Sequence, residues 1–275
     1  EVLPAVHDLD EAIADGAPQL YEQFPNNIIE RGCPPFGPKA LQELVIGDIE
    51  KGFEECAVVV EGTSRYETIS NPLPAESPGL VAWWDGPNQC NMKGSFQSPN
   101  IQKMIMQLAM SNVNVRVISA NVGGSFGSKN TVPMEGLYCA ALAKATGKPV
   151  KLIISKEAHL ATYMLRLGSR LTAKVGLLPD GTVHAYEGTW LVGSGVHSDF
   201  GQGQIANGLG RAMLLLNECK HWNYQPHLVA TNRCRSGGIR GFGGQESYAS
   251  LVPVLSMAMA KMNLDPVEFF KKNMC

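Results

Sequence analysis

The sequence predicts an α+β (mixed α/β) fold in which sheets are covered by packed helices. Segments with alternating apolar and polar residues and many β-branched side chains indicate strands. Other segments carry apolar residues at helical spacing between capping residues. The two kinds of segment are interspersed along the chain, which is typical of mixed α and β domains. The predicted strands span residues 57–70, 79–85, 113–120, 149–154, 170–178 and 182–191.

The last two of these strands are predicted to form a β-hairpin. They alternate on either side of Pro179, Asp180 and Gly181. The glycine supplies the positive φ that a tight turn requires. We expect this hairpin to be part of the scaffold.

Two helices are predicted in the first half of the chain. Residues 99–108 follow Ser98 as an N-cap and carry Pro99 at the first helical position. Residues 132–146 are rich in alanine and stop at Gly147, a typical C-terminal signal. We expect the methionines of the first helix and Cys139 of the second to serve in packing.

A third helix is predicted at the C-terminal end. It begins after Asp265 as N-cap, with Pro266 at the first position and Glu268 at the third.

Two glycine-rich loops are the most informative features of the sequence. The first, residues 121–130, follows an apolar strand and has glycine at positions 123, 124 and 127. The second, residues 236–246, contains Arg240-Gly241-Phe242-Gly243. Such loops let the backbone approach a ligand closely and turn N–H groups toward an oxygen-rich or anionic group. Neither loop has the spacing of a P-loop or of a dinucleotide-binding motif, and each one alone would be read as an ordinary turn.

Taken together, the two loops resemble a known family. The patterns Gly-Gly-x-Phe-Gly-x-Lys at 123–129 and Arg-Gly-Phe-Gly at 240–243 resemble the molybdenum-pterin subunit of the xanthine oxidase and aldehyde oxidoreductase family. Segments 3–13, 47–62 and 263–273 resemble the same family, so nearly the whole chain is covered. The resemblance implies that residues 1–46 are a linker from a preceding domain and that residues 47–275 are the first molybdopterin-binding domain.

The resemblance implies a molybdenum-molybdopterin cofactor. In the family the metal is held by the dithiolene sulfurs of the pterin, so no protein metal ligand is expected, and the protein supplies placement and electrostatics. Whether the cofactor carries a cytosine dinucleotide stays open. The cofactor-binding residues that the resemblance implies are Gly123, Gly124, Ser125, Phe126, Gly127, Arg240, Gly241, Phe242 and Gly243.

The resemblance also implies a substrate pocket formed by Phe126, Asn130, Arg211 and Phe242. Asn130 stands where many relatives have a glutamate, and an amide cannot carry the negative charge, which argues against purine recognition of the xanthine oxidase kind. Arg211 is either an orienting cation or a solvated cation on a helix, and the sequence leaves both open. Ser70 stands where relatives often have a glutamine.

No catalytic residue is expected in this chain. In the family the catalytic base is a glutamate in a second molybdopterin-binding domain, and the resemblance does not extend to that segment. We therefore expect a chain that is inactive alone. Its expected partners are a second molybdopterin-binding domain or subunit, an iron–sulfur subunit, a flavin (FAD) subunit in some family members, and a small-molecule substrate. The assembled enzyme would oxidise an aldehyde or an N-heteroaromatic compound with water as the oxygen source.

Composition excludes several other classes. The net charge of −2 and the lack of a basic block offer no surface for nucleic acid. No apolar run approaches the ~18 residues of a membrane span. The seven cysteines are an odd number without metal-ligand spacing and are predicted to be reduced thiols. The six histidines are scattered and are predicted to be structural or solvated. These features predict a cytoplasmic protein that binds neither nucleic acid nor membrane.

Two alternative functions remain open at this level. The first is a non-catalytic assembly or binding module that keeps the fold, which the departures at Ser70 and Asn130 make worth testing. The second is a nucleotide-dependent enzyme that uses the first loop as a phosphate cradle. Cofactor content separates the first alternative from the hydroxylase, and ATP or NAD titration tests the second.

Overall fold

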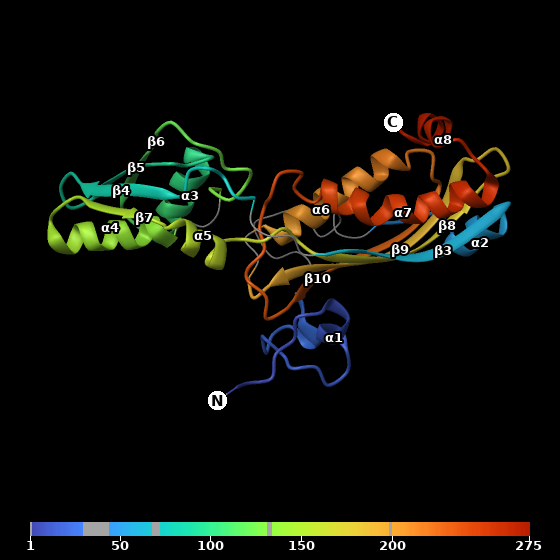
Figure 1. The fold of residues 1–275 in the computed structure, drawn as a ribbon, viewed down its shortest axis with the longest axis horizontal. Helices are drawn as coiled ribbons and strands as arrows, with labels where there is room; N and C mark the ends of the chain where they lie inside the picture. Colours follow the sequence, from blue (N-terminus) through green and yellow to red (C-terminus); the bar gives the residue numbers. More distant parts are fainter. Residues whose placement is uncertain (1, 30–43, 68–71, 131–133, 198–199) are drawn as a thin grey trace. The chain divides into compact units, whose positions relative to one another are not determined.

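The computed structural model describes residues 2–29, 44–67, 72–130, 134–197 and 200–275. The chain forms two compact units (Figure 1). Unit 1 comprises residues 1–69, 167–236 and 241–275, and unit 2 comprises residues 70–166 and 237–240. Each unit has its own sheet and helices, which confirms the predicted α+β class.

Unit 1 is built on a six-stranded sheet. Its central strands β9 and β10 are parallel, and the other pairs are antiparallel. Along the sheet the strands are β1 (Ile28–Ile29), β10 (His221–Ala230), β9 (Val183–Gly195), β8 (Ser169–Leu177) and β3 (Val58–Tyr66), with β2 (Leu44–Ile46) also paired to β10.

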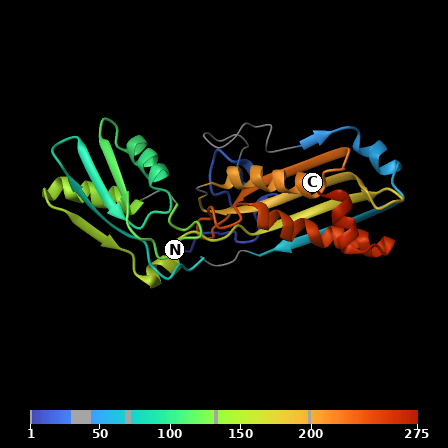
Figure 2. The same ribbon diagram turned by 90° about the horizontal axis from the view of Figure 1, so that it is seen from above.

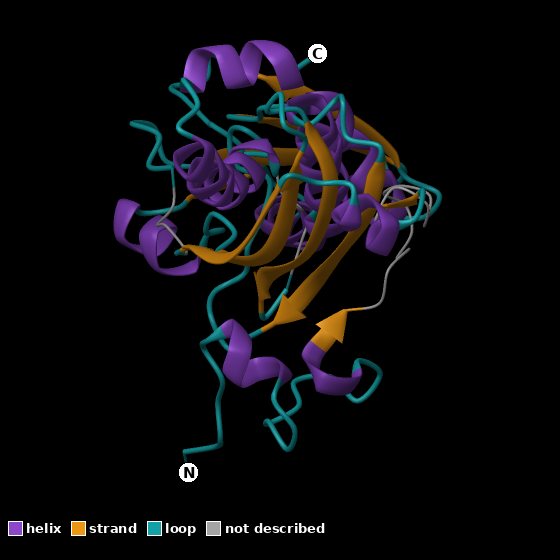
Figure 3. Cartoon of the chain, turned by 90° about the vertical axis from the view of Figure 1, so that its right-hand side faces the viewer, coloured by secondary structure: helices purple, strands orange, loops and turns teal. Residues whose placement is uncertain are grey.

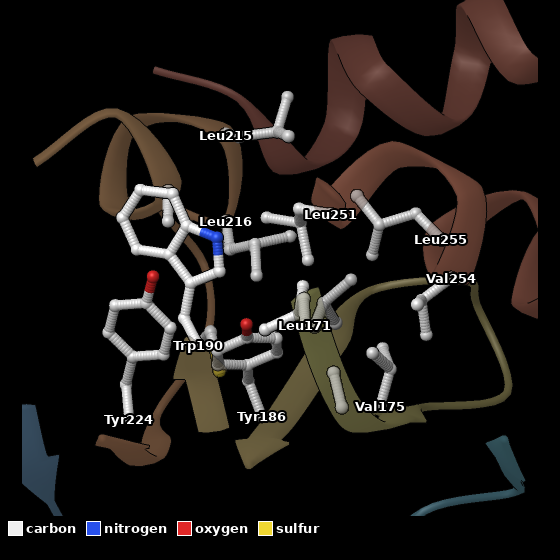
Figure 4. Close-up of a cluster of buried hydrophobic side chains, with 14 of the residues drawn as sticks. Leu171, Val175, Tyr186, Trp190, Leu215, Leu216, Tyr224, Leu251, Val254 and Leu255 are labelled. Carbon is white, nitrogen blue, oxygen red and sulfur yellow. The ribbon is translucent and has the colours of Figure 1, made fainter. Parts of the chain in front are cut away.

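Helices α6 (Gly201–Leu215) and α7 (Gly244–Met262) cover one face of this sheet (Figure 3). Between the sheet and the helices lies an aromatic and aliphatic core in which Trp190 and Tyr186 meet Leu251 of α7 (Figure 4). Trp190 is 1% exposed, so burial of its large ring is a major stabilising term for the unit. This core fixes α6 and α7, which flank the second glycine loop.

Unit 1 has three further short helices: α1 (Leu9–Ile13), α2 (Ile49–Glu54) and α8 (Pro266–Asn273). Helices α1 and α2 contact strands β9 and β10, and α8 contacts α7. A 3₁₀ turn spans Pro25–Asn27. Residues 1–46 fall within unit 1. Their assignment as a linker, and the assignment of residues 47–275 as one cofactor-binding domain, stay predictions.

Unit 2 has a four-stranded sheet in the order β6 (Asn114–Ser119), β5 (Gln89–Gly94), β4 (Gly79–Trp84) and β7 (Val150–Ile153). Helices α3 (Pro99–Ala109) and α4 (Met134–Thr146) pack on one core with β4 and β5 (Figure 2), and α5 (Lys156–Thr162) follows β7. Met106 and Cys139 are buried in that core, which confirms their predicted packing role, whereas Met104 is exposed.

Most of the predicted elements are confirmed in the described residues. Strands β3, β4, β6, β7, β8 and β9 and helices α3, α4 and α8 lie where the sequence patterns predict them. One detail is wrong: Ser98 occupies the N-cap of α3, but its side chain makes no capping hydrogen bond. Ser70 and the predicted helix start at residues 132–133 lie outside the described residues.

Strands β5 and β10 and helix α7 are not predicted by the sequence patterns. Strand β10 contains Pro226, which argues against a central strand. On the edge of β10 that faces away from β9, strand β2 pairs with residues 222–224 and strand β1 with residues 228–229. Among the described strands none pairs with Pro226 on this edge, so a proline is possible there. Proline is tolerated where its missing N–H is not needed.

None of the helices in the described part of the chain is long and apolar enough to cross a lipid bilayer.

Asn273 fastens α8 to the β8–β9 hairpin. Its buried amide accepts from the Val183 N–H (2.7 Å) and donates to the carbonyls of Gly181 (3.1 Å) and Phe269 (2.9 Å). Asn273→Ala should lower the free energy of unfolding by about 3 kcal/mol, because it leaves buried backbone groups without partners. Urea denaturation measures this. Lys271→Ala, which removes only an exposed ion pair with Glu268, is the control and should change stability by less than about 0.5 kcal/mol; equal effects of both substitutions would contradict the assignment.

Candidate functional site

The first glycine loop has a run of left-handed backbone. Gly124 has φ 90°, Phe126 has φ 55° and Gly127 has φ 107°. A left-handed conformation is unusual for a bulky residue and costs of order 1–3 kcal/mol. Phe126 nevertheless keeps it, with a ring that is 45% exposed. The loop therefore presents an aromatic side chain in a conformation that the surrounding contacts must enforce.

The contact that enforces it is a backbone approach from the second glycine segment. A Cβ on Gly127 would lie 1.8 Å from the carbonyl oxygen of Gly238, so no other residue fits there. Beside it, the Arg240 N–H donates to the carbonyl of Phe126 (2.9 Å), and Arg166 donates to the carbonyl of Arg240 (2.8 Å). All these residues belong to unit 2. The structure thus places Arg240 beside the first loop, and the predicted cofactor-binding role of both stays a prediction.

Gln97 and Ser125 hold the interior of the first loop. The side-chain oxygen of Gln97 accepts from the Ser125 hydroxyl and from the Gly127 N–H (2.8 Å). The Ser125 oxygen in turn accepts from the Lys129 N–H (3.0 Å). The hydroxyl of Ser125, a predicted cofactor-binding residue, is therefore used within the loop, and its backbone N–H is the group left for a ligand.

An ion pair that the sequence analysis missed anchors the same loop. The Lys129 ammonium, whose side chain is 1% exposed, donates to a carboxylate oxygen of Glu76 at 2.7 Å. That oxygen also accepts from the Ser95 hydroxyl and from the Gly123 N–H (2.8 Å). The bonds from Lys129 and Ser95 hold the pKa of Glu76 at about 2. The lysine of the loop motif was a visible signal, but its partner Glu76 is distant in sequence.

Several polar groups of this loop have no hydrogen-bond partner among the described residues and could bind a ligand. Within the described residues, the backbone N–H groups of Gly124, Ser125 and Phe126 donate to no protein acceptor. The Asn130 side-chain oxygen is buried and has no partner among those residues. Unpaired buried polar groups are costly and often mark a ligand site. Uncharged backbone donors fit an oxygen-rich ligand, and the unpaired Asn130 oxygen fits a ligand that also offers an N–H; a metal-bound pterin has both kinds of group.

The second loop repeats the conformation in unit 1. Gly241, Phe242 and Gly243 have φ of 101°, 46° and 89°, and the Phe242 ring is 37% exposed. A Cβ on Gly243 would lie 2.0 Å from the carbonyl oxygen of Gln204 on α6. Asn207 donates to the Phe242 carbonyl at 2.6 Å. Here too a close backbone approach maintains a left-handed phenylalanine.

Two residues of α6 lie beside this loop. The Arg211 stem packs against Gly244 at the start of α7, and no ion pair of Arg211 occurs in the described part of the chain. A cation at the positive end of a helix favours an anion nearby. The buried side-chain amide of Gln204 has no hydrogen-bond partner among the described residues. No sequence motif indicated Gln204.

Gly127→Ala should disrupt the first loop. Its Cβ meets a backbone carbonyl at a φ that alanine avoids, so the free energy of unfolding should fall by about 3 kcal/mol or more. The control is Gly210→Ala on an exposed turn of α6, where nothing lies within 4 Å. Alanine there should raise stability by about 0.5 kcal/mol. Thermal unfolding compares the two variants, and a neutral Gly127→Ala would contradict the close approach.

Glu76→Gln should destabilise the first loop in a pH-dependent way. At pH 7 the variant leaves the buried Lys129 charge unpaired and should lose about 2 kcal/mol, a figure reduced because Glu76 is 39% exposed. The pKa of Glu76 falls from 4.5 to about 2 on folding, so its contribution is complete above pH 4.5 and is lost toward pH 2. The difference between wild type and variant should narrow over this window.

Urea midpoints at several pH values measure this difference. The exposed Glu157, replaced by glutamine, is the control and should change stability by at most about 0.5 kcal/mol. A difference for Glu76→Gln that does not vary with pH would overturn the ion-pair assignment.

Comparison with known proteins gives a consistent result. Residues 21–274 match the family described as "Molybdopterin cofactor-binding domain". The chain is 26% identical to "Probable hypoxanthine oxidase XdhD" of Escherichia coli (strain K12), covering 99% of this chain and 30% of that protein. It is 24% identical to "Nicotinate dehydrogenase large molybdopterin subunit" of Eubacterium barkeri, covering 98% of this chain and 60% of that protein.

Solved structures show the same fold. Aldehyde oxidoreductase from Desulfovibrio gigas superposes with a TM-score of 0.84 at 24% identity, covering 100% of this chain and 29% of that one. Quinoline 2-oxidoreductase from Pseudomonas putida 86 gives 0.84 at 22% identity, covering 100% and 34%. The chain therefore spans about a third of these proteins. By its sequence match it belongs to the molybdopterin cofactor-binding domain family, within the xanthine and aldehyde oxidoreductases.

Proposed function

We propose that this chain is the first molybdopterin-binding domain of a molybdenum hydroxylase. The observation that carries the proposal is the docking of the Phe126–Gly127 turn on the Gly238–Arg240 backbone, which leaves three consecutive N–H groups for a ligand. When bound, the cofactor supplies a redox centre that accepts two electrons as oxygen from water is added to a substrate carbon. The metal itself is held by the pterin dithiolene, and no protein ligand to molybdenum is proposed.

Each loop has its own part in holding the cofactor. In unit 2 the backbone N–H groups of Gly124, Ser125 and Phe126 would donate hydrogen bonds to the cofactor. Gly123, Gly127 and Arg240 would line the site and hold the loop through hydrogen bonds of their own main chains. In unit 1 Gly241, Phe242 and Gly243 form the second contact. Backbone donors fixed by close packing need no rearrangement on binding, which favours a tightly held cofactor.

The substrate is proposed to be an aldehyde or an N-heteroaromatic compound. Phe126 and Phe242 offer exposed ring faces for a planar molecule. Asn130 can accept or donate a hydrogen bond without charge, and Arg211 supplies a cation. The names of the relatives, which include a hypoxanthine oxidase, a nicotinate dehydrogenase and an aldehyde oxidoreductase, support this class.

The proposed enzyme also needs other domains or subunits. The relatives are longer than this chain, which supports a second molybdopterin-binding domain or subunit that carries the catalytic glutamate. Iron–sulfur and flavin partners would carry electrons away, and the chain alone would be inactive. A cytosine dinucleotide form of the cofactor also belongs to the proposal. The six described cysteines are free thiols, which favours a reducing, cytoplasmic location.

The first test is the metal and pterin content of the protein purified from molybdate-fed cells with its bound partners. Elemental mass spectrometry should find one molybdenum per chain, and oxidation should release a fluorescent pterin. A co-purifying segment with the second half of the site should be present. An intact complex without metal and pterin would instead support the non-catalytic module.

A second test addresses the pocket. Phe242→Ala in the assembled enzyme should lower kcat/KM by about tenfold, which corresponds to the ~1.4 kcal/mol of an aromatic contact, while molybdenum content stays unchanged. The control is Tyr138→Ala on α4, an exposed aromatic side chain outside both loops. Unchanged kinetics for Phe242→Ala would remove Phe242 from the pocket.

A further inference from the structure

We infer that Glu55, His184 and His221 form a second metal site in unit 1, one that binds a zinc ion and fastens helix α2 to the sheet. One ligand atom from each residue lies within 4.8 Å of the others. The three residues come from the C-cap of α2, from β9 and from the first position of β10. They are far apart in sequence, so the histidines looked scattered until the fold joined them.

The side chains of Glu55, His184 and His221 already lie close to one another. His184 Nε2 and Glu55 Oε2 are 2.7 Å apart, and the two imidazole rings have centroids 4.8 Å apart at 67°. In this structure the two atoms form a hydrogen bond in which the imidazole N–H donates to the carboxylate. Across a tetrahedral zinc ion with bonds of ~2.0–2.1 Å the same two atoms would be about 3.3 Å apart. Glu55 has an exposed side chain at a helix end and can open the pair by that amount.

The two histidines are held in place by main-chain structure. A Cβ on Gly47 would lie 2.6 Å from His221 Nδ1, and one on Gly52 would lie 2.7 Å from its Cγ, so the ring fits only between two glycines. The Asp48 N–H donates to His221 Nδ1 at 3.0 Å, and this hydrogen bond would give way on zinc binding, because a metal-bound neutral imidazole has no lone pair left to accept it. His184 lies on β9 beside His221 on β10, and these strands pair in parallel. Ligands with fixed positions bind a metal at low entropic cost.

The set of ligands selects the ion. Two imidazoles and one carboxylate suit zinc and related transition metals, whereas magnesium and calcium prefer oxygen ligands. The nearby Cys219 does not belong to the set, because its Sγ is directed to the carbonyls of His184 (3.5 Å) and His221 (3.4 Å). Lys51 lies 3.9 Å from Glu55, and both side chains are exposed, so this weak ion pair can give way.

The site is separate from the second glycine loop. His221 begins β10, and the chain reaches the second loop only after the other end of this ten-residue strand, which is about 33 Å long. Helix α2 contacts β9 and β10, and an ion at Glu55, His184 and His221 would join these three elements in the folded state only. Binding would therefore stabilise unit 1 without taking part in the redox chemistry.

Calorimetric titration with zinc chloride tests the site in the protein purified as it occurs, after removal of loosely bound metal with a chelator. The expected result is that each chain binds one further zinc ion during the titration, in addition to any zinc that the chelator did not remove. Magnesium should show no comparable binding. Glu55→Gln, His184→Gln and His221→Gln should each weaken zinc binding by tenfold or more. Zinc should also raise the midpoint of thermal unfolding of the wild type but not of these variants.

Two features keep the test decisive. Glu55→Gln changes an exposed side chain, so it should fold normally, as circular dichroism can verify. His7→Gln removes an exposed histidine of the N-terminal segment and should bind zinc like the wild type. Lack of a saturable equivalent, or zinc binding that persists in Glu55→Gln and His184→Gln, would overturn the proposal.

Discussion

The candidate site depends on one close backbone approach, that of Gly127 to the carbonyl of Gly238. Because a side chain at position 127 would overlap that oxygen, the two segments can meet only through glycine. The meeting aligns the Phe126 carbonyl with the Arg240 N–H, and the N–H groups of Gly124, Ser125 and Phe126 have no acceptor among the described residues. A single packing constraint thus determines the conformation of the first loop and its contact with the Gly238–Arg240 segment.

The same constraint occurs twice. In each loop a left-handed phenylalanine precedes a left-handed glycine that packs against a carbonyl, of Gly238 in unit 2 and of Gln204 in unit 1. A phenylalanine in this conformation is unfavourable by itself, so the surrounding contacts must supply the free energy. Strain of this kind often occurs at functional sites, which supports the proposal that both rings contact a ligand.

The sequence predicts the parts of the structure whose causes are local. Alternation located β3, β4 and the β8–β9 hairpin, and Asp265 and Pro266 marked the start of α8. The glycine loops were identifiable because the positive φ angles and the close backbone approach require glycine at fixed positions of the motif. The sequence patterns did not predict three features that depend on tertiary contacts. These are the strand that contains Pro226, the ion pair of Lys129 with Glu76, and the cluster of Glu55 with two histidines. In each case the partners are distant in sequence, and no periodicity connects them.

The Glu76–Lys129 pair also explains the electrostatic character of the first loop. A free lysine at this position would suit an anionic ligand, but the side chain of Lys129 is 1% exposed and its ammonium is paired with the Glu76 carboxylate. The two charges largely cancel, so the donors that remain are neutral backbone amides. Neutral donors bind an oxygen-rich group by geometry, with little attraction for anions of other shapes. Selectivity for one large cofactor over abundant phosphates would follow from this arrangement, since a phosphate cradle relies on a lysine that is free to reach its ligand.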